Sequence, residues 1–305
     1  MKTKYRVAVV QDTPVFLDKQ ATIDKVCDRI KAAATEGADL VVFPEAFVSA
    51  YPDWVWVLPP SRKDMINRLY REFLENAVSA SDDSLLRVGK AAKEAGVHVA
   101  LGVNERNSES SNASVYNSLV YFSPDGVEIG RHRKLIPTGG ERLMWSPGNG
   151  ASLVSCHTEI GRLGGLICWE NYMPLARVAM YQAGVQVYVA PTWDSSESWQ
   201  IAMRHIAREG GMYVIGCSQA VRMSDIPDRY EFKSFYPAGR EWINKGNSVV
   251  VGPAGQILAG PLEEEQSILC ADIDLDAISS QKWMLDVAGH YARPDVFEFR
   301  INNHV

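Results

Sequence analysis

The chain has 305 residues, of which 46% are hydrophobic and 22% charged, which is typical of a globular protein that buries a large core. The net charge of −6 argues against nucleic acid or an anionic membrane as the main partner, because phosphate groups are bound by basic surfaces. The composition therefore excludes a disordered chain and favours a small neutral molecule as the ligand.

The N-terminal segment has an apolar run at 7–10 that ends at Gln11 and Asp12, which is too short for a signal peptide. No apolar stretch of the sequence reaches the ~20 residues that a membrane-spanning helix needs. The five cysteines are odd in number, widely spaced and without a Cys-x-x-Cys pair, so we expect neither a disulfide scaffold nor a structural metal. These features predict a cytoplasmic protein, whose thiols stay reduced.

Short apolar runs rich in valine, isoleucine and tyrosine alternate with amphipathic stretches, which predicts a mixture of strands and helices. Strands are expected at 5–11, 39–44, 97–104, 117–123, 127–132, 151–156, 162–167, 186–190, 212–218, 247–252, 256–259 and 267–273. The clearest helix is expected at 18–36, because its apolar residues share one face and Gly37 provides a stop. Further helices are expected at 63–79, 82–95, 173–183 and 197–210.

Three strand segments occur twice in the same order: those at 38–44, 94–102 and 117–126 resemble those at 185–191, 209–216 and 247–255. We interpret them as an internal repeat, although strand and turn segments also resemble one another through composition alone. With a repeat, a single domain 1–305 would contain two similar halves, whose almost continuously apolar strands need cover on both faces. The prediction is an α/β (α+β) fold built as a four-layer α-β-β-α sandwich.

Residues 221–246 are dense in arginine, aspartate, tyrosine, lysine, proline and glycine and show no regular periodicity. We expect a long surface loop here, and long loops in compact domains commonly serve a function. The sequence leaves open whether this loop caps a site or forms a contact between subunits.

Cys168 follows the expected strand at 162–167 and precedes a helix with a proline in its first turn. A strand-to-helix turn projects a side chain out of the sheet and directs backbone N–H groups at it, which favours a thiolate. The preceding Gly164 and Gly165 allow another segment or a substrate to come close. The alternative, which also fits the other four cysteines, is a small buried core residue.

Glu45 ends the apolar run 40–44 and is followed by a stretch that contains Tyr51, Trp54 and Trp56. Apolar and aromatic surroundings raise the pKa of a carboxyl group and suit a general base or acid. A carboxylate directly after a buried strand can instead lie in solvent at the rim of the sheet.

Lys134 comes where the expected strand 127–132 ends, after Arg131, His132 and Arg133. Such a basic run commonly marks a solvated edge strand, but here an apolar run and then Glu141 follow. A lysine close to carboxylates stays charged and can stabilise negative charge on a reacting group. Cys168, Glu45 and Lys134 would all lie at strand ends, where sites form in such sheets.

These residues stand in motifs that resemble those of the nitrilase superfamily of carbon–nitrogen hydrolases. Phe43-Pro-Glu-Ala-Phe47 is similar to the family's Glu motif, His132-Arg-Lys-Leu-Ile-Pro-Thr138 to its Lys motif, and Cys168-Trp-Glu-Asn-Tyr-Met-Pro174 to its Cys motif. The three motifs occur in the family's order, and the resemblance extends over almost the whole chain.

The resemblance implies an α-β-β-α sandwich that assembles into a homodimer or a higher homo-oligomer, and a reaction that needs no metal and no cofactor. It assigns Cys168 as the nucleophile and Glu45 as the general base. Lys134, with the backbone N–H of Trp169, would stabilise the tetrahedral species. Glu141 matches a second acid of the family, which would orient Lys134 or assist proton transfer.

Trp169 and Glu170 after the nucleophile resemble the true nitrilase branch, whose members convert an organic nitrile to the carboxylic acid and ammonia through a thioimidate and a thioester. An apolar or aryl nitrile would fit an aromatic pocket, although several aromatic residues could belong to the core. The expected substrate-binding residues are Tyr51, Trp56, Trp145, Trp169 and Trp193. The segment 145–150 departs from the family, in which an acidic residue is expected near these glycines.

The nearest alternative is an amidase or a cyanide-degrading enzyme of the same superfamily, because the same nucleophile can attack an amide carbonyl or cyanide. An alternative of another class is a non-catalytic sandwich that binds small molecules, and the intact set of Glu45, Lys134 and Cys168 argues against it. The sequence does not identify the natural nitrile.

Overall fold

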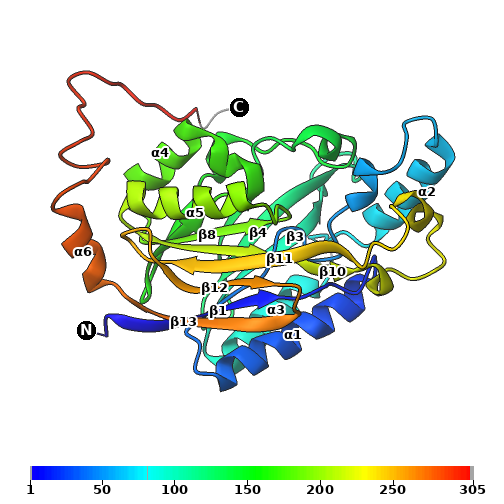
Figure 1. Ribbon diagram of the computed structural model, residues 1–305, viewed down its shortest axis with the longest axis horizontal. Coiled ribbons are helices and arrows are strands. Elements are labelled where there is room, and N and C mark those ends of the chain that lie inside the picture. Colours follow the sequence, from blue (N-terminus) through cyan, green and yellow to red (C-terminus); the bar gives the residue numbers. More distant parts are fainter. Residues whose placement is uncertain (1, 81, 303–305) are drawn as a thin grey trace.

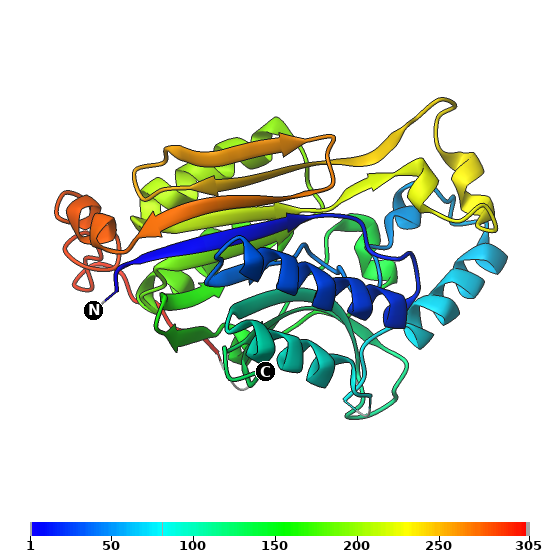
Figure 2. The same cartoon turned by 90° about the horizontal axis from the view of Figure 1, so that it is seen from below.

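The computed structural model describes residues 2–80 and 82–302, which form two β-sheets packed face to face with helices on both outer sides (Figure 1). In Figure 2, which is seen from below, the helices α1 (Lys19–Thr35) and α3 (Ser84–Ala95) lie in front of one sheet, whereas α4 (Pro174–Gln182) and α5 (Glu197–Gly210) lie behind the other. This arrangement confirms the predicted α-β-β-α sandwich. Within the described ranges, no helix combines the length and the apolar character that a membrane crossing requires.

The first sheet has the strand order β13-β1-β2-β3-β4-β5. Its strands are β1 (Lys4–Gln11), β2 (Leu40–Val42), β3 (His98–Arg106), β4 (Val115–Phe122), β5 (Glu128–Arg133) and β13 (Ser267–Asp274). The strands β1, β2 and β3 are parallel, and the outer three pair antiparallel with their neighbours. Helices α1 (Lys19–Thr35) and α3 (Ser84–Ala95) cover the outer face.

The second sheet has the order β10-β11-β9-β8-β7-β6, and β12 also pairs with β11. Its strands are β6 (Ser155–Thr158), β7 (Gly161–Gly165), β8 (Val187–Thr192), β9 (Tyr213–Ser218), β10 (Ala220–Arg222), β11 (Trp242–Val251) and β12 (Ile257–Glu263). The strands β7, β8 and β9 are parallel. Helices α4 (Pro174–Gln182) and α5 (Glu197–Gly210) cover the outer face.

Apolar side chains fill three layers of this sandwich. The layer between the sheets includes Leu40, Leu119 and Val187, which are fully buried. The residues that alternate with these along each strand point to the outer face and pack against the helices, as Val41 does on the first sheet and Tyr188 on the second. Burying one large aliphatic side chain contributes roughly 1.5–3 kcal/mol, so strands that are apolar on both faces are stable only with cover on both.

The two sheets repeat the same local topology. In the first, β2 and β3 are parallel and β4 follows antiparallel; in the second, β8, β9 and β11 do the same. The repeated sequence segments overlap these strands, so the internal repeat predicted from the sequence has a structural counterpart.

Two glycines allow the strands that lead to the site to pass closely. A Cβ atom on Gly165 would lie 1.9 Å from the carbonyl oxygen of Val189 in the neighbouring strand. A Cβ atom on Gly102 would lie 2.1 Å from the carbonyl oxygen of Pro44. Larger residues at either position would push apart the backbone segments that carry the candidate site.

Several boundaries differ from the expected ones. The strand expected at 151–156 begins at Ser155, because the 3-10 helix η3 (Gly150–Ser152) precedes it. The helix expected at 63–79 is α2 (Lys63–Glu75), which ends where Asn76 bonds back to the Glu72 carbonyl. Helix α6 (Asp276–Lys282) and strand β10 were not predicted, because short elements with few buried residues carry little periodicity.

The segment 221–246 is more ordered than the predicted long loop. It contains the end of β10, the 3-10 helices η5 (Met223–Asp225) and η6 (Glu231–Phe235), and the beginning of β11. Phe232 and Tyr230 pack on Phe16, which places this segment over η1 (Asp53–Trp56) and α2. The proximity of η1 links the segment to the candidate site.

Candidate active site

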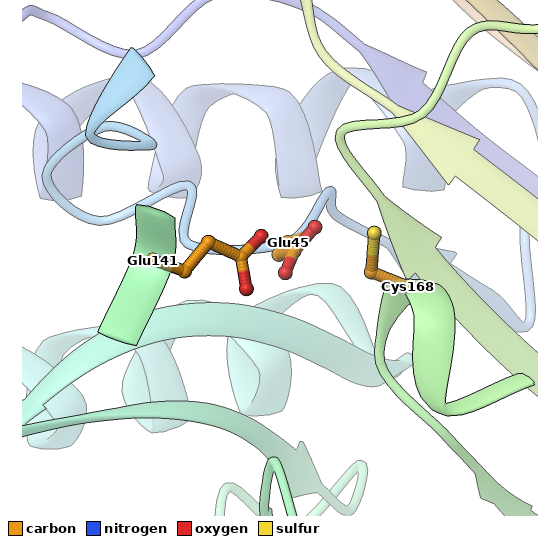
Figure 3. A group of neighbouring side chains, drawn as sticks. All are labelled: Glu45, Glu141 and Cys168. Carbon is orange, nitrogen blue, oxygen red and sulfur yellow. The ribbon is translucent and has the colours of Figure 1, made fainter. Parts of the chain in front are cut away.

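Cys168 lies just beyond β7, at the first residue of the 3-10 helix η4 (Cys168–Tyr172). Its backbone is left-handed, with φ of 53°, a conformation that costs a non-glycine residue roughly 1–2 kcal/mol. The Asn171 amide donates to the carbonyl oxygens of Leu166 and Cys168 and holds this turn. The thiol is buried and lies beside Glu45, which stands between it and Glu141 in Figure 3.

Glu45 follows β2 and is buried at the base of the site, not at a solvated rim. Its Oε1 atom accepts hydrogen bonds from Asn117 Nδ2 at 2.7 Å and from Lys134 Nζ at 2.8 Å. Its Oε2 atom is buried and has no hydrogen-bond partner within residues 2–80 and 82–302. This oxygen is therefore free to accept a proton.

Lys134 lies beyond β5, and its ammonium group is completely buried between two carboxylates. The Nζ atom is 2.8 Å from Glu45 Oε1 and 2.7 Å from Glu141 Oε2. Its backbone N–H donates to the Asn117 carbonyl, and its carbonyl accepts from Gly148. The basic run that begins at Arg131 thus ends in a buried cation and not on a solvated edge.

Burial and neighbouring charges set the protonation of the three groups. Burial raises the pKa of Glu45, and Lys134 partly offsets this. Burial by itself lowers the pKa of Lys134, but the charges of Glu45, Cys168 and Glu141 outweigh it and raise that pKa, so the ammonium stays charged. Burial and then Glu45 raise the pKa of Cys168, so the resting residue is a thiol and not the thiolate that the turn alone indicates. The thiol therefore needs a base.

Glu141 belongs to η2 (Gly139–Leu143), where it forms a capping box with Thr138. Its Oε2 atom accepts the Thr138 N–H at 2.7 Å as well as the Lys134 ammonium, and its Oε1 atom accepts the Tyr51 hydroxyl at 2.6 Å. Burial raises the pKa of Tyr51 well above its ordinary value, so this phenol remains a donor. Glu141 is therefore held in one orientation from which it fixes Lys134.

Glu45, Glu141 and Cys168 also have the donor atoms that a metal ion would use, and one such atom from each lies within 4.8 Å of the others. The Lys134 ammonium already bonds to both carboxylates and supplies the positive charge between them. The donor set with this lysine is suited to acid–base and nucleophilic chemistry.

A second buried ion pair joins the loops that carry Lys134 and Cys168. His132 Nε2 is 2.9 Å from Glu170 Oε2, and His132 Nδ1 is 2.9 Å from the Ser152 carbonyl. The Glu170 carboxylate also accepts the backbone N–H groups of Leu135 and Ile167, the neighbours of the two site residues. One carboxylate thus fixes both loops relative to each other.

A cavity of about 350 Å³ opens above the thiol. It is lined by Tyr51, Trp56, Thr138, Glu141, Cys168, Trp169, Trp193, Asp194 and Ser196. The Tyr51 and Trp193 rings stack at a centroid distance of 4.4 Å and form one wall. The size and the aromatic walls suit a small apolar ligand.

Four of the five aromatic residues expected in the pocket line it, and Trp145 does not. Trp145 is buried behind Tyr51, and its Nε1 atom donates to Asn104 Oδ1. Its ring lies 5.6 Å from the Lys134 ammonium. Trp145 is therefore a core residue that backs the site and does not face the cavity.

Sequence reasoning missed several residues that contact the site, of which three stand out. Asn117 bonds to Glu45, Thr192 contacts the Cys168 sulfur at 3.2 Å, and Asp194 lies at the rim of the cavity. For Thr192 a signal was present, because Pro191-Thr192 repeats the position of Pro44-Glu45. Asn117 and Asp194 carry no comparable pattern, since polar residues at strand ends are common.

The comparisons with known proteins agree with this geometry. The family model described as carbon-nitrogen hydrolase matches residues 6–282. The chain is 39% identical to an aliphatic nitrilase of Sinorhizobium fredii over 98% of this chain and 96% of that protein, and 38% identical to nitrilase 1 of Arabidopsis thaliana over 99% and 88%. Among solved structures, Nit3 of Saccharomyces cerevisiae, a member of the nitrilase superfamily, has a TM-score of 0.75 at 22% identity and covers 95% of this chain and 97% of its own.

Proposed function

Because the chain belongs to the carbon–nitrogen hydrolase family, we propose that it is a nitrilase that converts an organic nitrile to the carboxylic acid and ammonia. The observation that carries this proposal is the buried set of Cys168, Glu45, Lys134 and Glu141 at the base of an aromatic cavity. The nitrilases of Sinorhizobium fredii and Arabidopsis thaliana, which match over nearly full length, support the nitrile as substrate.

In the first half of the reaction, Glu45 Oε2 takes the thiol proton of Cys168 because this oxygen has no other partner among the described residues. The sulfur uses the electron pair of its S–H bond to attack the nitrile carbon. One π bond of the nitrile breaks, and its nitrogen takes up the proton that Glu45 received from the thiol. The product of this half is a thioimidate on Cys168.

In the second half, water adds to the thioimidate with Glu45 as the base. The carbon–nitrogen bond breaks, ammonia leaves, and a thioester remains on Cys168. A second water hydrolyses the thioester, so the carboxylic acid leaves and the thiol is restored. The Glu45 carboxylate accepts and returns protons in each of these steps, which suits a buried carboxylate of raised pKa.

Negative charge develops on the substrate while each tetrahedral species forms. The Lys134 ammonium is charged and fixed by two carboxylates, so it can stabilise that charge without rearranging. We assign the backbone N–H of Trp169 as a second donor. Glu141 positions Lys134, and its bonds to Thr138 and Tyr51 keep it in place.

The cavity supports an apolar nitrile, including an aryl nitrile, with the substituent between the aromatic walls. We assign Tyr51, Trp56, Trp169 and Trp193 to substrate binding. The Tyr51 hydroxyl donates to Glu141 and accepts from Trp56 Nε1, so one wall of the pocket is hydrogen-bonded to the catalytic set.

We further propose a single catalytic domain over residues 1–305 that works as a homodimer or a higher homo-oligomer in the cytoplasm. Five free thiols, two of them only half-buried, support a reducing compartment. Sedimentation of the purified protein measures the oligomeric state directly.

Ammonia release from paired nitriles and amides tests the proposed function. A nitrilase releases ammonia and the carboxylic acid from the nitrile. Release from amides alone, or from cyanide alone, would contradict the proposal and point to the other activities of the family. Cys168→Ala should abolish turnover in a folded protein, and a substrate-derived mass increase that maps to Cys168 in the wild type would identify the covalent intermediate.

A further inference from the structure

Thr192 and Glu45 occupy equivalent positions in the two halves of the sandwich. Thr192 is the last residue of β8, which corresponds to β2 of the first sheet. Pro191-Thr192 follows the apolar run of β8 as Pro44-Glu45 follows that of β2. The two sheets therefore bring one polar residue each from the same place in the repeat to the Cys168 thiol.

The Thr192 hydroxyl lies in hydrogen-bond contact with the nucleophile. Its Oγ1 atom is 3.2 Å from Cys168 Sγ, and both side chains are buried. Within residues 2–80 and 82–302, Thr192 is the side chain that hydrogen-bonds to this sulfur. The Thr192 hydroxyl therefore contacts the reacting atom itself and not a residue that lies behind it.

The backbone of Asp194 sets the direction of this hydrogen bond. The Asp194 N–H donates to Thr192 Oγ1 at 2.9 Å. A hydroxyl has one hydrogen to donate and two lone pairs to accept with, so the N–H occupies a lone pair and leaves the O–H for the sulfur. Asp194 is in turn held by Trp169 Nε1, which donates to its Oδ2 atom at 2.9 Å.

The sulfur needs such a donor because its surroundings oppose a negative charge. It is buried, and the carboxylates of Glu45 and Glu141 raise its pKa further. Lys134 opposes this effect, but its ammonium bonds to those two carboxylates. A hydrogen bond to a charged atom in a buried site is stronger than one to a neutral atom, so an O–H donor favours the thiolate over the thiol.

We propose that Thr192 is a further catalytic residue, whose hydroxyl donates a hydrogen bond to Cys168 Sγ whenever that sulfur carries negative charge. When the thiol proton moves to Glu45, the sulfur keeps the electron pair of the S–H bond, and the Thr192 O–H points at that pair. When the thioester carbon–sulfur bond breaks, the pair returns to sulfur and is held again until Glu45 returns the proton. The second role rests on the proposed function, but the first concerns the thiol alone.

A structural role for Thr192 predicts different behaviour. If the hydroxyl only satisfied the Asp194 N–H, its removal would lower stability and leave the chemistry of the sulfur unchanged. Serine keeps the hydroxyl and would therefore serve both as a donor to the sulfur and as an acceptor for the Asp194 N–H. Valine has the shape of threonine without the hydroxyl and would serve in neither role. The reactivity of Cys168 towards an alkylating agent therefore separates the two roles.

The experiment measures the rate at which iodoacetamide alkylates Cys168, from pH 6 to pH 10, with the modified residue identified by peptide mass. The variants are Thr192→Val and Thr192→Ser, with Thr158→Val as the matched control. Thr158→Val also removes one hydrogen bond of a threonine hydroxyl, the one that Thr158 donates to the Gly161 carbonyl. Thr158 lies at the β6–β7 turn. Thermal melting confirms that each variant is folded, and Thr192→Ala replaces the valine variant if valine prevents folding.

Thr192→Val should slow alkylation about tenfold at each pH between 6 and 10, because a hydrogen bond to a charged group is worth roughly that factor. Thr192→Ser and Thr158→Val should stay within about threefold of the wild type. On a nitrile, Thr192→Val should lower kcat and leave KM within about threefold. Alkylation of Thr192→Val at the wild-type rate and pH would overturn the assignment. A wild type that releases no ammonia from nitriles while the alkylation rates differ as expected would overturn the proposed function and retain the role of Thr192.

Discussion

The His132 imidazole and the Glu170 carboxylate form a completely buried ion pair, with Nε2 at 2.9 Å from Oε2. His132 lies two residues before Lys134 in the sequence, and Glu170 lies two residues after Cys168. Because Glu170 also accepts the N–H groups of Leu135 and Ile167, it connects the loops that carry the cation and the nucleophile. The stability of this pair should therefore determine the geometry of the site.

The His132–Glu170 pair predicts a loss of stability at alkaline pH. Burial by itself lowers the pKa of His132, but Glu170 and the Ser152 carbonyl raise it above the ordinary value of about 6.5. A group whose folded-state pKa is raised stabilises the protein fully below its unfolded pKa, and this contribution disappears as the pH rises through the folded pKa. Urea unfolding between pH 6 and pH 10 should show this decline in the wild type.

His132→Asn should remove this pH dependence and cost about 3–5 kcal/mol, because one partner of a buried pair is lost. His98 contributes with the opposite sign, since burial lowers its pKa, so the difference between wild type and variant isolates His132. An equal pH dependence in the two proteins would show that His132 is not charged in the folded state.

Glu45→Gln should lower kcat about 10²–10⁴-fold, because the amide cannot accept the thiol proton. Burial raises the pKa of Glu45, and catalysis needs its carboxylate, so the acid limb of the wild-type kcat/KM profile should lie above the ordinary value of about 4.3. Ammonia release measured against pH checks both expectations. The control Glu159→Gln changes an exposed glutamate on the turn between β6 and β7 and should behave as the wild type. If kcat of Glu45→Gln equals that of the wild type, Glu45 is not the base.

The sandwich could be predicted from the sequence because its signal is repeated many times. The central strands of both sheets are apolar on both faces, and one large helix, α1, has a continuous buried stripe, so the need for cover on both sides is visible in the residues. The positions of Glu45, Lys134 and Cys168 at strand ends were visible in the same way. Their protonation was not, because it depends on how deeply each group is buried and on which charges face it.

The contacts that Asn117 makes with Glu45 and Glu170 with His132 could not be predicted, because each crosses between segments far apart in the chain. Trp145 shows the same limit: the sequence predicted it in the pocket together with Trp193, but only the fold places one behind Tyr51 and the other in the cavity. Likewise, residues 221–246 show no periodicity, because 3-10 helices and tertiary hydrogen bonds order much of this segment.

The segment 221–246 should control substrate binding through Asp53. The Tyr236 hydroxyl donates to Asp53 Oδ2, and Trp193 Nε1 donates to Oδ1 at 2.9 Å, so one half-buried carboxylate holds both the segment and a wall of the cavity. Tyr236→Phe should raise KM for bulky aryl nitriles several-fold, because Asp53 is no longer held by the Tyr236 hydroxyl and so fixes Trp193 less firmly. The change should affect kcat little, because the catalytic residues keep all their hydrogen bonds.

Tyr70→Phe is the matched control for Tyr236→Phe, since its hydroxyl donates to the Ala113 carbonyl away from the cavity. Steady-state kinetics with a small and a bulky nitrile measure the effect. An unchanged KM in Tyr236→Phe, or an equal rise in Tyr70→Phe, would show that the segment does not act on the pocket.

Asp194 should make the enzyme discriminate against nitriles that carry a carboxylate. Asp194 and Glu141 both line the cavity, and the Lys134 charge is neutralised by its two carboxylate partners, so an anionic substrate meets net negative charge. Asp194→Asn keeps an oxygen that can accept the Trp169 N–H and removes one charge. At about 8 Å and an effective dielectric constant of about 40, that charge is worth roughly 1 kcal/mol, or about fivefold. The ratio of kcat/KM for a cyano acid to that for its neutral amide-capped analogue should rise by this factor in Asp194→Asn, and most at low ionic strength, where screening is weakest. A ratio that stays constant would show that shape, and not charge, selects the substrate at this rim.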